Sequence, residues 1–146
     1  MHLSKKAEYA LRALAAIARQ PRAWQIQELS RAEKIPDKFL EQILLTLRRA
    51  GLLTSKRGLG GGYTLHKAAS EITLGEVIAI MDGPLAPVPC AAENPSEKCT
   101  CPNPHTCPIR KVMTGFRKEM EATLHGQTIE DLVRLSPSPD ALAFEI

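Results

Sequence analysis

Four cysteines gathered in one stretch are the residues of this chain best suited to chemistry. Cys90, Cys99, Cys101 and Cys107 lie in a proline-rich segment between residues 84 and 108. The sequence contains no segment apolar and long enough to cross a membrane, and its first residues lack the apolar core of a signal peptide. We therefore expect a cytoplasmic protein with no membrane partner. In that reducing compartment, clustered cysteines are more often metal ligands or redox groups than disulfides.

The spacing of these cysteines suits an iron–sulfur cluster as well as, or better than, zinc. Eight, one and five residues separate successive cysteines, whereas zinc ribbons and fingers usually contain paired knuckles. A bound metal would hold a loop of about 25 residues that otherwise has no structure of its own. In an extended chain Cys99 and Cys101 point in divergent directions, so one is expected to be a spare thiol or a redox partner. His105 is interpreted as a solvent-facing side chain rather than a ligand.

The stretch from Ile35 to Leu65 predicts the order helix, strand, glycine loop, strand. Apolar residues recur at helical spacing from position 39 to position 47, and Gly51 suits the left-handed residue that follows a helix. Short strands are expected at Leu52–Lys56 and Tyr63–His66. This order is typical of a winged helix-turn-helix, in which the loop between the strands is the wing.

The wing loop reads Arg57-Gly58-Leu59-Gly60-Gly61-Gly62. Glycines such as Gly58 and Gly60 let the backbone approach another surface, while Lys56 and Arg57 add positive charge at the edge. Arg57 is the predicted minor-groove reader. A nucleotide-binding turn is rejected because such a turn opens a helix, whereas Tyr63 continues a strand; a plain hairpin turn is the alternative.

Two further helices, expected at residues 3–20 and 25–34, complete the helix-turn-helix. The buried stripe of the first is predicted to consist of Leu3, Ala7, Ala10, Leu14 and Ile17. Polar residues near the start of its second member, Lys38, Glu41 and Gln42, are predicted to reach base edges in the major groove. Arg48 and Arg49 are assigned to phosphate contacts. A solvated helix face is the alternative reading of all five side chains.

Basic residues are concentrated in the half of the chain that contains the wing. Residues 1–69 contain 13 Lys and Arg against 5 Asp and Glu, a net charge of +8, and residues 70–146 carry a net charge of −5. Such a distribution attracts the phosphate backbone of double-stranded DNA, because neutralised phosphates release counterions. The sequence shows no arrangement of nucleophile, base and oxyanion donors, and we do not expect an enzyme.

The second half predicts three more helices. Thr73 and Glu76 have the spacing of a capping box that opens the first of these helices. The second helix is long and carries an apolar seam made of Ile109, Val112, Met113, Phe116, Met120 and Leu124. Such a seam often packs against the same helix of a second copy of the chain, which predicts a homodimer. Packing within one subunit is the alternative. A short helix opens at Thr128.

The expected fold is mainly α with a small β-hairpin: a winged helix-turn-helix followed by a long C-terminal dimerisation helix. Its expected organisation is a DNA-binding domain over residues 1–69, then a linker helix, cysteine loop and dimerisation helix of the same fold over residues 70–135, and a flexible tail over residues 136–146. The expected partners are a double-stranded DNA operator and a second copy of the chain.

Several segments closely resemble a bacterial regulator family that includes IscR, NsrR and CymR. They are LSKKAEYALRAL, FLEQILLTLRRAGLLTSKRGLGGGYTL, ITLGEVI, and CPNPHTC followed by a long helix. The resemblance covers about residues 1–135 and implies a homodimeric winged-helix transcription factor whose long helix forms the dimer interface. It also matches Lys38, Glu41 and Gln42 to recognition-helix positions and Arg57 to the wing arginine.

The same resemblance implies a [2Fe-2S] or [4Fe-4S] cluster whose state changes operator affinity. Cys90, Cys101 and Cys107 match the three loop ligands of cluster-binding members. Arg110 stands where some members place a ligand histidine, so Glu8, which matches a ligand carboxylate from the partner's first helix, and the extra Cys99 compete as fourth ligand. Other members bind no cluster, which leaves thiol oxidation, zinc or a partner protein as alternative means of sensing.

Overall fold

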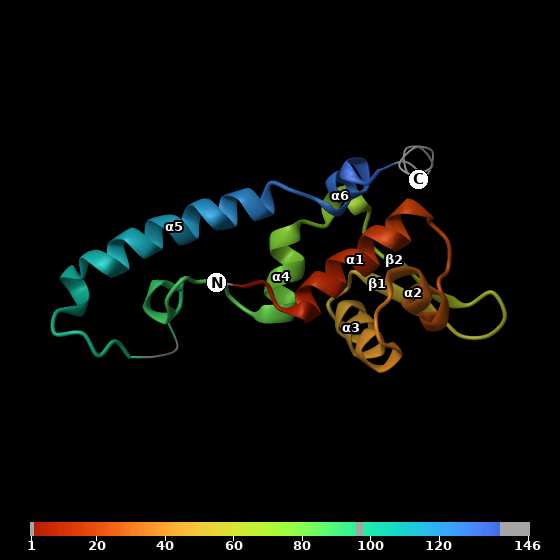
Figure 1. Ribbon diagram of the computed structural model, residues 1–146, viewed down its shortest axis with the longest axis horizontal. Helices are drawn as coiled ribbons and strands as arrows, with labels where there is room; N and C mark the ends of the chain where they lie inside the picture. Colours follow the sequence, from red (N-terminus) through yellow and green to blue (C-terminus); the bar gives the residue numbers. More distant parts are fainter. Residues whose placement is uncertain (1, 96–97, 138–146) are drawn as a thin grey trace.

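The computed structural model describes residues 2–95 and 98–137 and consists of a helical body with one projecting arm. Figure 1 shows helix α5 extending from the body, with the chain that carries the cysteines returning beneath it. The wing loop and the far end of α5 lie at opposite ends of the long axis (Figure 1). Of the predicted tail, only Ser136 and Pro137 fall within the described residues.

Helix α1 (Lys5–Arg19) is the central helix of the body. Ser4 caps it by accepting a hydrogen bond from the Ala7 amide, and its buried stripe includes Leu14 and Ile17. Leu3 was predicted to be part of this stripe, and that prediction is wrong: its side chain is 43% exposed. The reason is that Leu3 precedes the cap and therefore does not follow the helical period.

The helix-turn-helix consists of α2 (Ile26–Glu33) and α3 (Asp37–Arg49), which pack against each other and against α1. Four apolar residues of α3 are buried: Leu40, Ile43, Leu44 and Leu47. Gly51 follows the helix with φ +84°, and its amide donates to the Arg48 carbonyl at 3.0 Å. This is the left-handed terminator expected of a glycine after a helix.

The hairpin pairs β1 (Leu53–Lys56) with β2 (Gly62–Leu65) in antiparallel register. A short segment before α2 adds a third backbone contact, because Trp24 and Tyr63 exchange amide–carbonyl hydrogen bonds of 3.0 and 2.8 Å. A Cβ on Gly62 would lie 2.5 Å from the Trp24 carbonyl oxygen. Glycine is therefore required where the hairpin approaches this segment.

Helix α4 (Leu74–Asp82) follows the 3-10 helix η1 (Ala69–Glu71) and connects the hairpin with the arm. Half of the expected capping box forms: the Thr73 hydroxyl accepts from the Glu76 amide at 3.1 Å. The carboxylate of Glu76 instead pairs with the Lys67 ammonium at 3.1 Å, because Lys67, just after the hairpin, lies within its reach. The expected helix start is correct, and the partner of Glu76 is not the expected one.

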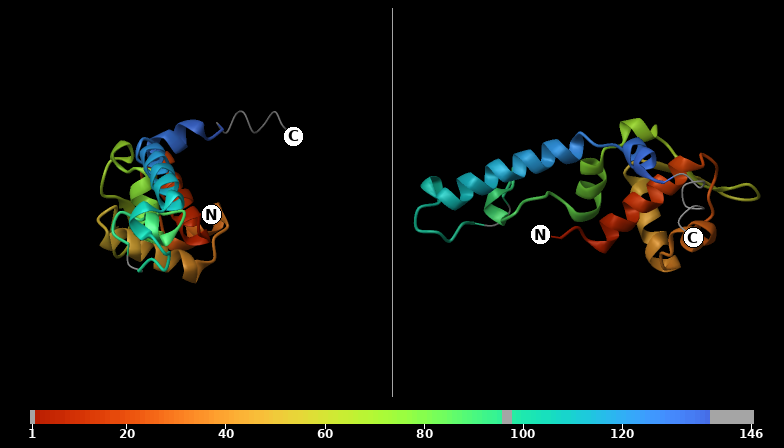
Figure 2. Two further views of the ribbon diagram at one scale, coloured as in Figure 1. Left: turned by 90° about the vertical axis from the view of Figure 1, so that its left-hand side faces the viewer. Right: turned by 45° about the horizontal axis from the view of Figure 1, so that its top comes forward.

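The arm consists of two short 3-10 helices, η2 (Pro89–Ala91) and η3 (Pro104–Thr106), and the long helix α5 (Pro108–His125). The right view in Figure 2 shows α5 leading out of the body. Helix η2 packs against α5, and the last helix, α6 (Ile129–Leu135), returns to pack on α1 and η1. None of the described helices combines the length and apolar character needed to cross a membrane.

Replacing Gly62 with alanine should destabilise the protein by about 1–3 kcal/mol, because φ is +142° there and the new methyl group would overlap the Trp24 backbone. The free energy of unfolding measured in urea tests this expectation. Gly115→Ala on α5 is the control, since a Cβ there meets nothing within 4 Å and alanine favours helix. Equal stability of the two variants would contradict the assigned contact.

Candidate functional site

The outer face of α3 presents the side chains that were predicted to read base edges. Lys38, Glu41 and Gln42 are all exposed on the side of α3 opposite its buried leucines. Glu41 and Gln42 lie one helical turn after Lys38. The cause is the helical period, which turns the apolar residues toward α1 and leaves these polar residues outside. The structure therefore brings the three candidates together on one surface.

Arg48 connects α3 with the hairpin. Its Nη1 atom donates to Ser55 Oγ at 3.0 Å, and Ser55 lies on β1. On the same strand Thr54 shares a hydrogen bond of 2.9 Å with Thr64 across the hairpin. The hairpin is thus attached both to α3 and, through Trp24, to the segment before α2, so these elements form one body.

The wing loop is a tight turn with exposed basic residues at its base. Lys56 and Arg57 are exposed, Gly58 and Gly60 have φ values of +93° and +75°, and the Gly61 amide donates to the Gly58 carbonyl at 3.0 Å. Residues with a Cβ are strained at such φ values. The glycines named in the sequence prediction are therefore structural requirements of the turn.

The cysteine loop brings Cys99 and Cys101 together. The Cys101 amide donates a hydrogen bond to Cys99 Sγ at 3.4 Å. The expectation that Cys99 and Cys101 diverge is wrong, because side chains two residues apart lie on the same face even in an extended chain, and here the Cys101 amide reaches Cys99 Sγ. Cys107 occupies the cap position of α5, and Cys90 lies in η2.

This contact shifts the pKa values of the Cys99 and Cys101 thiols in opposite directions. The amide and thiol of Cys101 donate hydrogen bonds to Cys99 and hold the pKa of Cys99 below its usual range. The pKa of Cys101 is raised to about 11, first because its proton is held by Cys99 and then because a second thiolate would face the charge of the first. Cys99 is therefore the more nucleophilic member of the pair near neutral pH.

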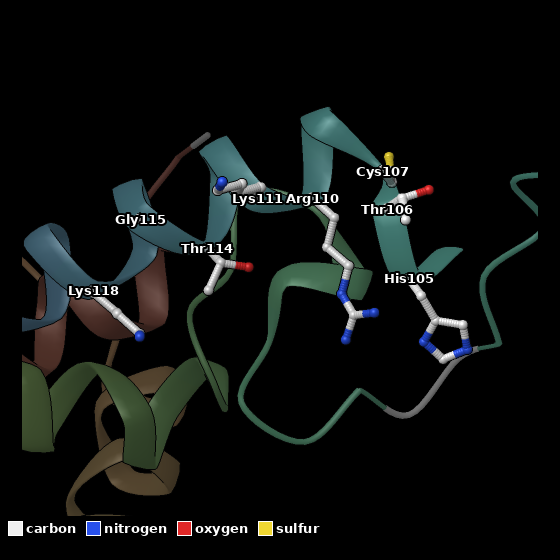
Figure 3. A pocket seen from close by; sticks show the side chains of 8 residues that line it. All are labelled: His105, Thr106, Cys107, Arg110, Lys111, Thr114, Gly115 and Lys118. Atoms are coloured by element: carbon white, nitrogen blue, oxygen red, sulfur yellow. The ribbon is translucent and has the colours of Figure 1, made fainter. Parts of the chain in front are cut away.

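Arg110 connects the two ends of the cysteine loop. Its Nε atom donates to the Cys90 carbonyl at 3.1 Å, and its Nη1 atom donates to the Pro104 carbonyl at 3.5 Å. Figure 3 shows the Arg110 side chain extending from α5 toward the loop. The sequence had excluded this residue as a metal ligand, and the structure gives it a different role: it holds the loop against the helix.

Two cavities flank Arg110. One, of about 680 Å³, lies along α5 and includes Cys107; its charged lining residues Arg110, Lys111 and Lys118 are basic (Figure 3). The other, of about 330 Å³, is lined by Cys90, Cys99, His105 and Arg110 among others. Positive charge beside the thiols favours anionic sulfur, which is the form that ligates metals and reacts with oxidants.

The four cysteines are of the type that ligates iron–sulfur clusters, but their side chains are not gathered around one point. Among residues 2–95 and 98–137, no three Cys, His, Asp or Glu side chains are grouped closely enough to hold one metal ion. Glu8, the other candidate ligand, pairs on α1 with Lys5 at 2.9 Å and with Arg12 at 3.9 Å. Binding a cluster would therefore require Cys90 and the contacting thiols to be drawn together.

The helix-turn-helix, the hairpin with its glycine turn and the long α5 together define a winged helix-turn-helix protein. Residues 3–135 match the Rrf2 family, described as iron-dependent transcriptional regulators. The chain belongs to this family, and it is a transcriptional regulator with a DNA-binding fold rather than an enzyme.

Comparisons with individual proteins agree with this membership. A relative from Rhodobacter capsulatus, named as an rrf2-like HTH-type transcriptional regulator, is 36% identical over 90% of this chain and 91% of its own length. The solved structure of CymR, the global cysteine regulator of B. subtilis, has a TM-score of 0.77 at 26% identity, covering 94% of this chain and 99% of that chain. The predicted fold class and the stated family resemblance are confirmed.

The fold is also shared with IscR of T. potens. That structure has a TM-score of 0.73 at 24% identity and covers 92% of this chain and 87% of its own. At this identity the likeness concerns the fold. The CymR and IscR structures together show that one backbone arrangement serves regulators with different names, so the cysteine chemistry of this chain has to be argued from its own residues.

Replacing Arg110 with alanine should loosen the cysteine loop, because a charged donor shared by two carbonyls contributes about 1.5–3 kcal/mol per hydrogen bond. Limited proteolysis of the cysteine loop in metal-free protein should therefore become roughly tenfold faster. Lys111→Ala, an exposed neighbour on α5, is the control. Unchanged rates in the Arg110 variant would show that these hydrogen bonds do not hold the loop.

Proposed function

We propose that this protein is a sequence-specific regulator that binds a double-stranded DNA operator through α3 and the wing. Lys38, Glu41 and Gln42 contact base edges in the major groove, and Lys56 and Arg57 contact the adjacent backbone and minor groove. The observation that carries the proposal is the exposure of these side chains on one rigid body whose sequence, residues 1–69, has a net charge of +8. Gly58 and Gly60 let the wing backbone come close to the DNA.

Arg57→Ala should weaken operator binding and lower the slope of log affinity against log salt by about 1, because one cation fewer displaces counterions. The measurement is a titration of a labelled duplex at several salt concentrations. Arg134→Ala on α6 is the control, since Arg134 is equally a surface arginine and pairs with Glu130 at 3.2 Å, away from the wing. Identical slopes for wild type and the Arg57 variant would exclude this role for Arg57.

We also propose that the protein acts as a homodimer through α5. Ile109, Val112 and Phe116 are 62%, 65% and 47% exposed along one side of this helix. Three large apolar side chains in a row on a projecting helix form the kind of surface that a second copy covers. Two recognition helices related by a twofold axis then suit a palindromic operator.

Phe116→Asp should convert the dimer to a monomer, because the interface would have to bury an unpaired carboxylate. Light scattering after gel filtration measures the mass directly. Ala122→Asp is the matched control, since Ala122 is exposed on α5 outside the seam. A dimer that survives Phe116→Asp would place the interface elsewhere.

For sensing, we propose that the cysteine loop binds an iron–sulfur cluster that modulates operator affinity. Cys90, Cys101 and Cys107 would hold it, with Cys99 or the partner subunit's Glu8 completing the set. A bound cluster supplies a group whose oxidation state and integrity respond to oxygen and iron supply. The residues of the chain contribute the thiolates, and Arg110 keeps both ends of the loop on α5.

The thiol contact favours a second, metal-free candidate. In this scheme the Cys99 thiolate attacks one oxygen of a peroxide and breaks the O–O bond. Cys99 becomes a sulfenic acid, and the other oxygen leaves as hydroxide or alkoxide, which is protonated to water or an alcohol. The Cys101 thiol then attacks this sulfur, releasing water and leaving a disulfide, so that two thiols are oxidised and one peroxide is reduced. Its support is the hydrogen-bonded contact between Cys99 and Cys101.

The absorption spectrum of protein purified without oxygen, with iron and sulfide analysis, separates the two candidates. A cluster predicts broad visible bands and equal iron and sulfide, both lost in Cys107→Ser. Cys99→Ser and Glu8→Gln are measured separately, and the variant whose spectrum changes identifies the fourth ligand. Colourless protein that cannot be reconstituted, and whose DNA affinity depends on peroxide and on Cys99, would replace the cluster with the thiol switch.

A further inference from the structure

Leu59 is the most exposed large apolar side chain in the described part of the chain. Its relative exposure is 109%, against 47–65% for Ile109, Val112 and Phe116. Those three lie together on α5, where a second copy would cover them. Leu59 belongs to the wing loop between β1 and β2, and this loop lies at the opposite end of the molecule from the arm (Figure 1). Exposing a whole leucine side chain to water is unfavourable, so an external apolar contact would stabilise it.

The neighbours of Leu59 leave its side chain clear on both sides. Gly58 and Gly60 flank it, and a Cβ added to either glycine would meet nothing within 4 Å. Both have φ values in the left-handed region, so side chains are disfavoured at both positions. The tip of the wing is therefore a bare backbone turn with one aliphatic side chain.

The base of the loop is rigidly attached, which fixes the direction in which Leu59 projects. The Gly61 amide bonds the Gly58 carbonyl, and a Cβ on Gly61 would lie 2.4 Å from the Lys56 carbonyl oxygen. Gly62 in turn packs on the Trp24 backbone. A preorganised loop of this kind loses less conformational entropy than a flexible one when its tip enters a binding partner.

We infer that Leu59 enters the minor groove of the operator as an apolar wedge and bends the duplex at the point of contact. The inference rests on the proposed DNA-binding function and adds a residue that reads how easily the DNA deforms. Charge identifies DNA as the partner of Leu59: Arg57, two residues away and exposed, attracts the wing to phosphate-lined surfaces. Aliphatic side chains in the minor groove partly unstack a base step and kink the duplex away from the protein.

The wedge and the wing arginine have different physical signatures. Arg57 acts through charge and contributes to the salt dependence of binding. Leu59 is uncharged, so removing it should lower affinity at every salt concentration without changing the slope. Because pyrimidine–purine steps unstack more easily than others, Leu59 should also determine which step is preferred beneath the wing.

The test uses full-length protein and a 30-base-pair duplex enriched by the wild-type protein from a randomised pool, with fluorescent dyes at its two ends. Leu59→Ala should weaken binding about tenfold, equivalent to about 1.4 kcal/mol, and reduce the bend reported by energy transfer. Leu59→Met should retain most of both, because methionine is also long and apolar. Leu135→Ala is the control, since Leu135 is 79% exposed on α6 and distant from the wing.

Unchanged affinity in Leu59→Ala would overturn the inference, and so would weaker binding with an unchanged bend. A changed salt slope would also overturn it, because the effect would then be electrostatic. Circular dichroism and the oligomeric mass of each variant verify that the exposed tip was altered without disturbing the fold. If the wild-type protein enriches no duplex from the pool, the DNA-binding proposal fails as well, which is distinguishable from failure of the wedge alone.

Discussion

Close packing around α1 is the constraint on which the rest of the structure depends. This helix contacts α2, α3, α4, α6 and the second strand, so it is surrounded on most sides. Five of its seven buried residues are alanines, among them Ala7, Ala10 and Ala13, which are fully buried. Small side chains let several helices approach one axis at once, and a larger residue there would force the neighbours apart. The positions of α3, α4 and α6 are therefore set by the same helix.

In the proposed regulation, a signal from the cysteine loop to α3 and the wing would use the contacts around α4, which packs against both α5 and α3. At one end of this helix the Ser4 amide donates to the Asp82 carboxylate at 3.2 Å, which joins the start of α1 to the beginning of the cysteine loop. At the other end the Thr73 hydroxyl lies 3.2 Å from Nδ1 of His125 at the end of α5, and the ring of His125 packs over Gly75. The same helix reaches the hairpin through the ion pair between Glu76 and Lys67.

These contacts give the proposed regulation a physical basis. A change in the loop that shifts α5 relative to α4 would also change the placement of the hairpin and α3, and a coupling free energy of about 1–3 kcal/mol would alter affinity roughly 5- to 150-fold. The physical link between the two regions is the spatial continuity of these contacts. In the proposed dimer, the arm formed by α5 and its loop would also set the spacing of the two α3 helices.

Much of the fold and part of the candidate site could be predicted from the sequence. The exposed face of α3, the left-handed Gly51 and the glycine turn of the wing follow from period and backbone sterics, which act within a few residues. The apolar seam of α5 was also visible as a period, although its exposure was not. Arg110 was considered only as a failed ligand, because its bond to Cys90 joins residues twenty positions apart and no local pattern signals such a contact.

The amino-acid sequence by itself determined the element order, the helix ends and the family, since apolar period, caps and glycines express local preferences that the whole fold satisfies together. Only the tertiary structure decided that Leu3 is exposed, that Glu76 pairs with Lys67, and that Cys99 and Cys101 face each other. It also decided that Arg110 holds the loop and that Leu59 stands alone at the wing tip. The physical reason is that side-chain contacts across a fold depend on how far apart the elements lie. The residue periodicity of a single helix or strand carries no information about that distance.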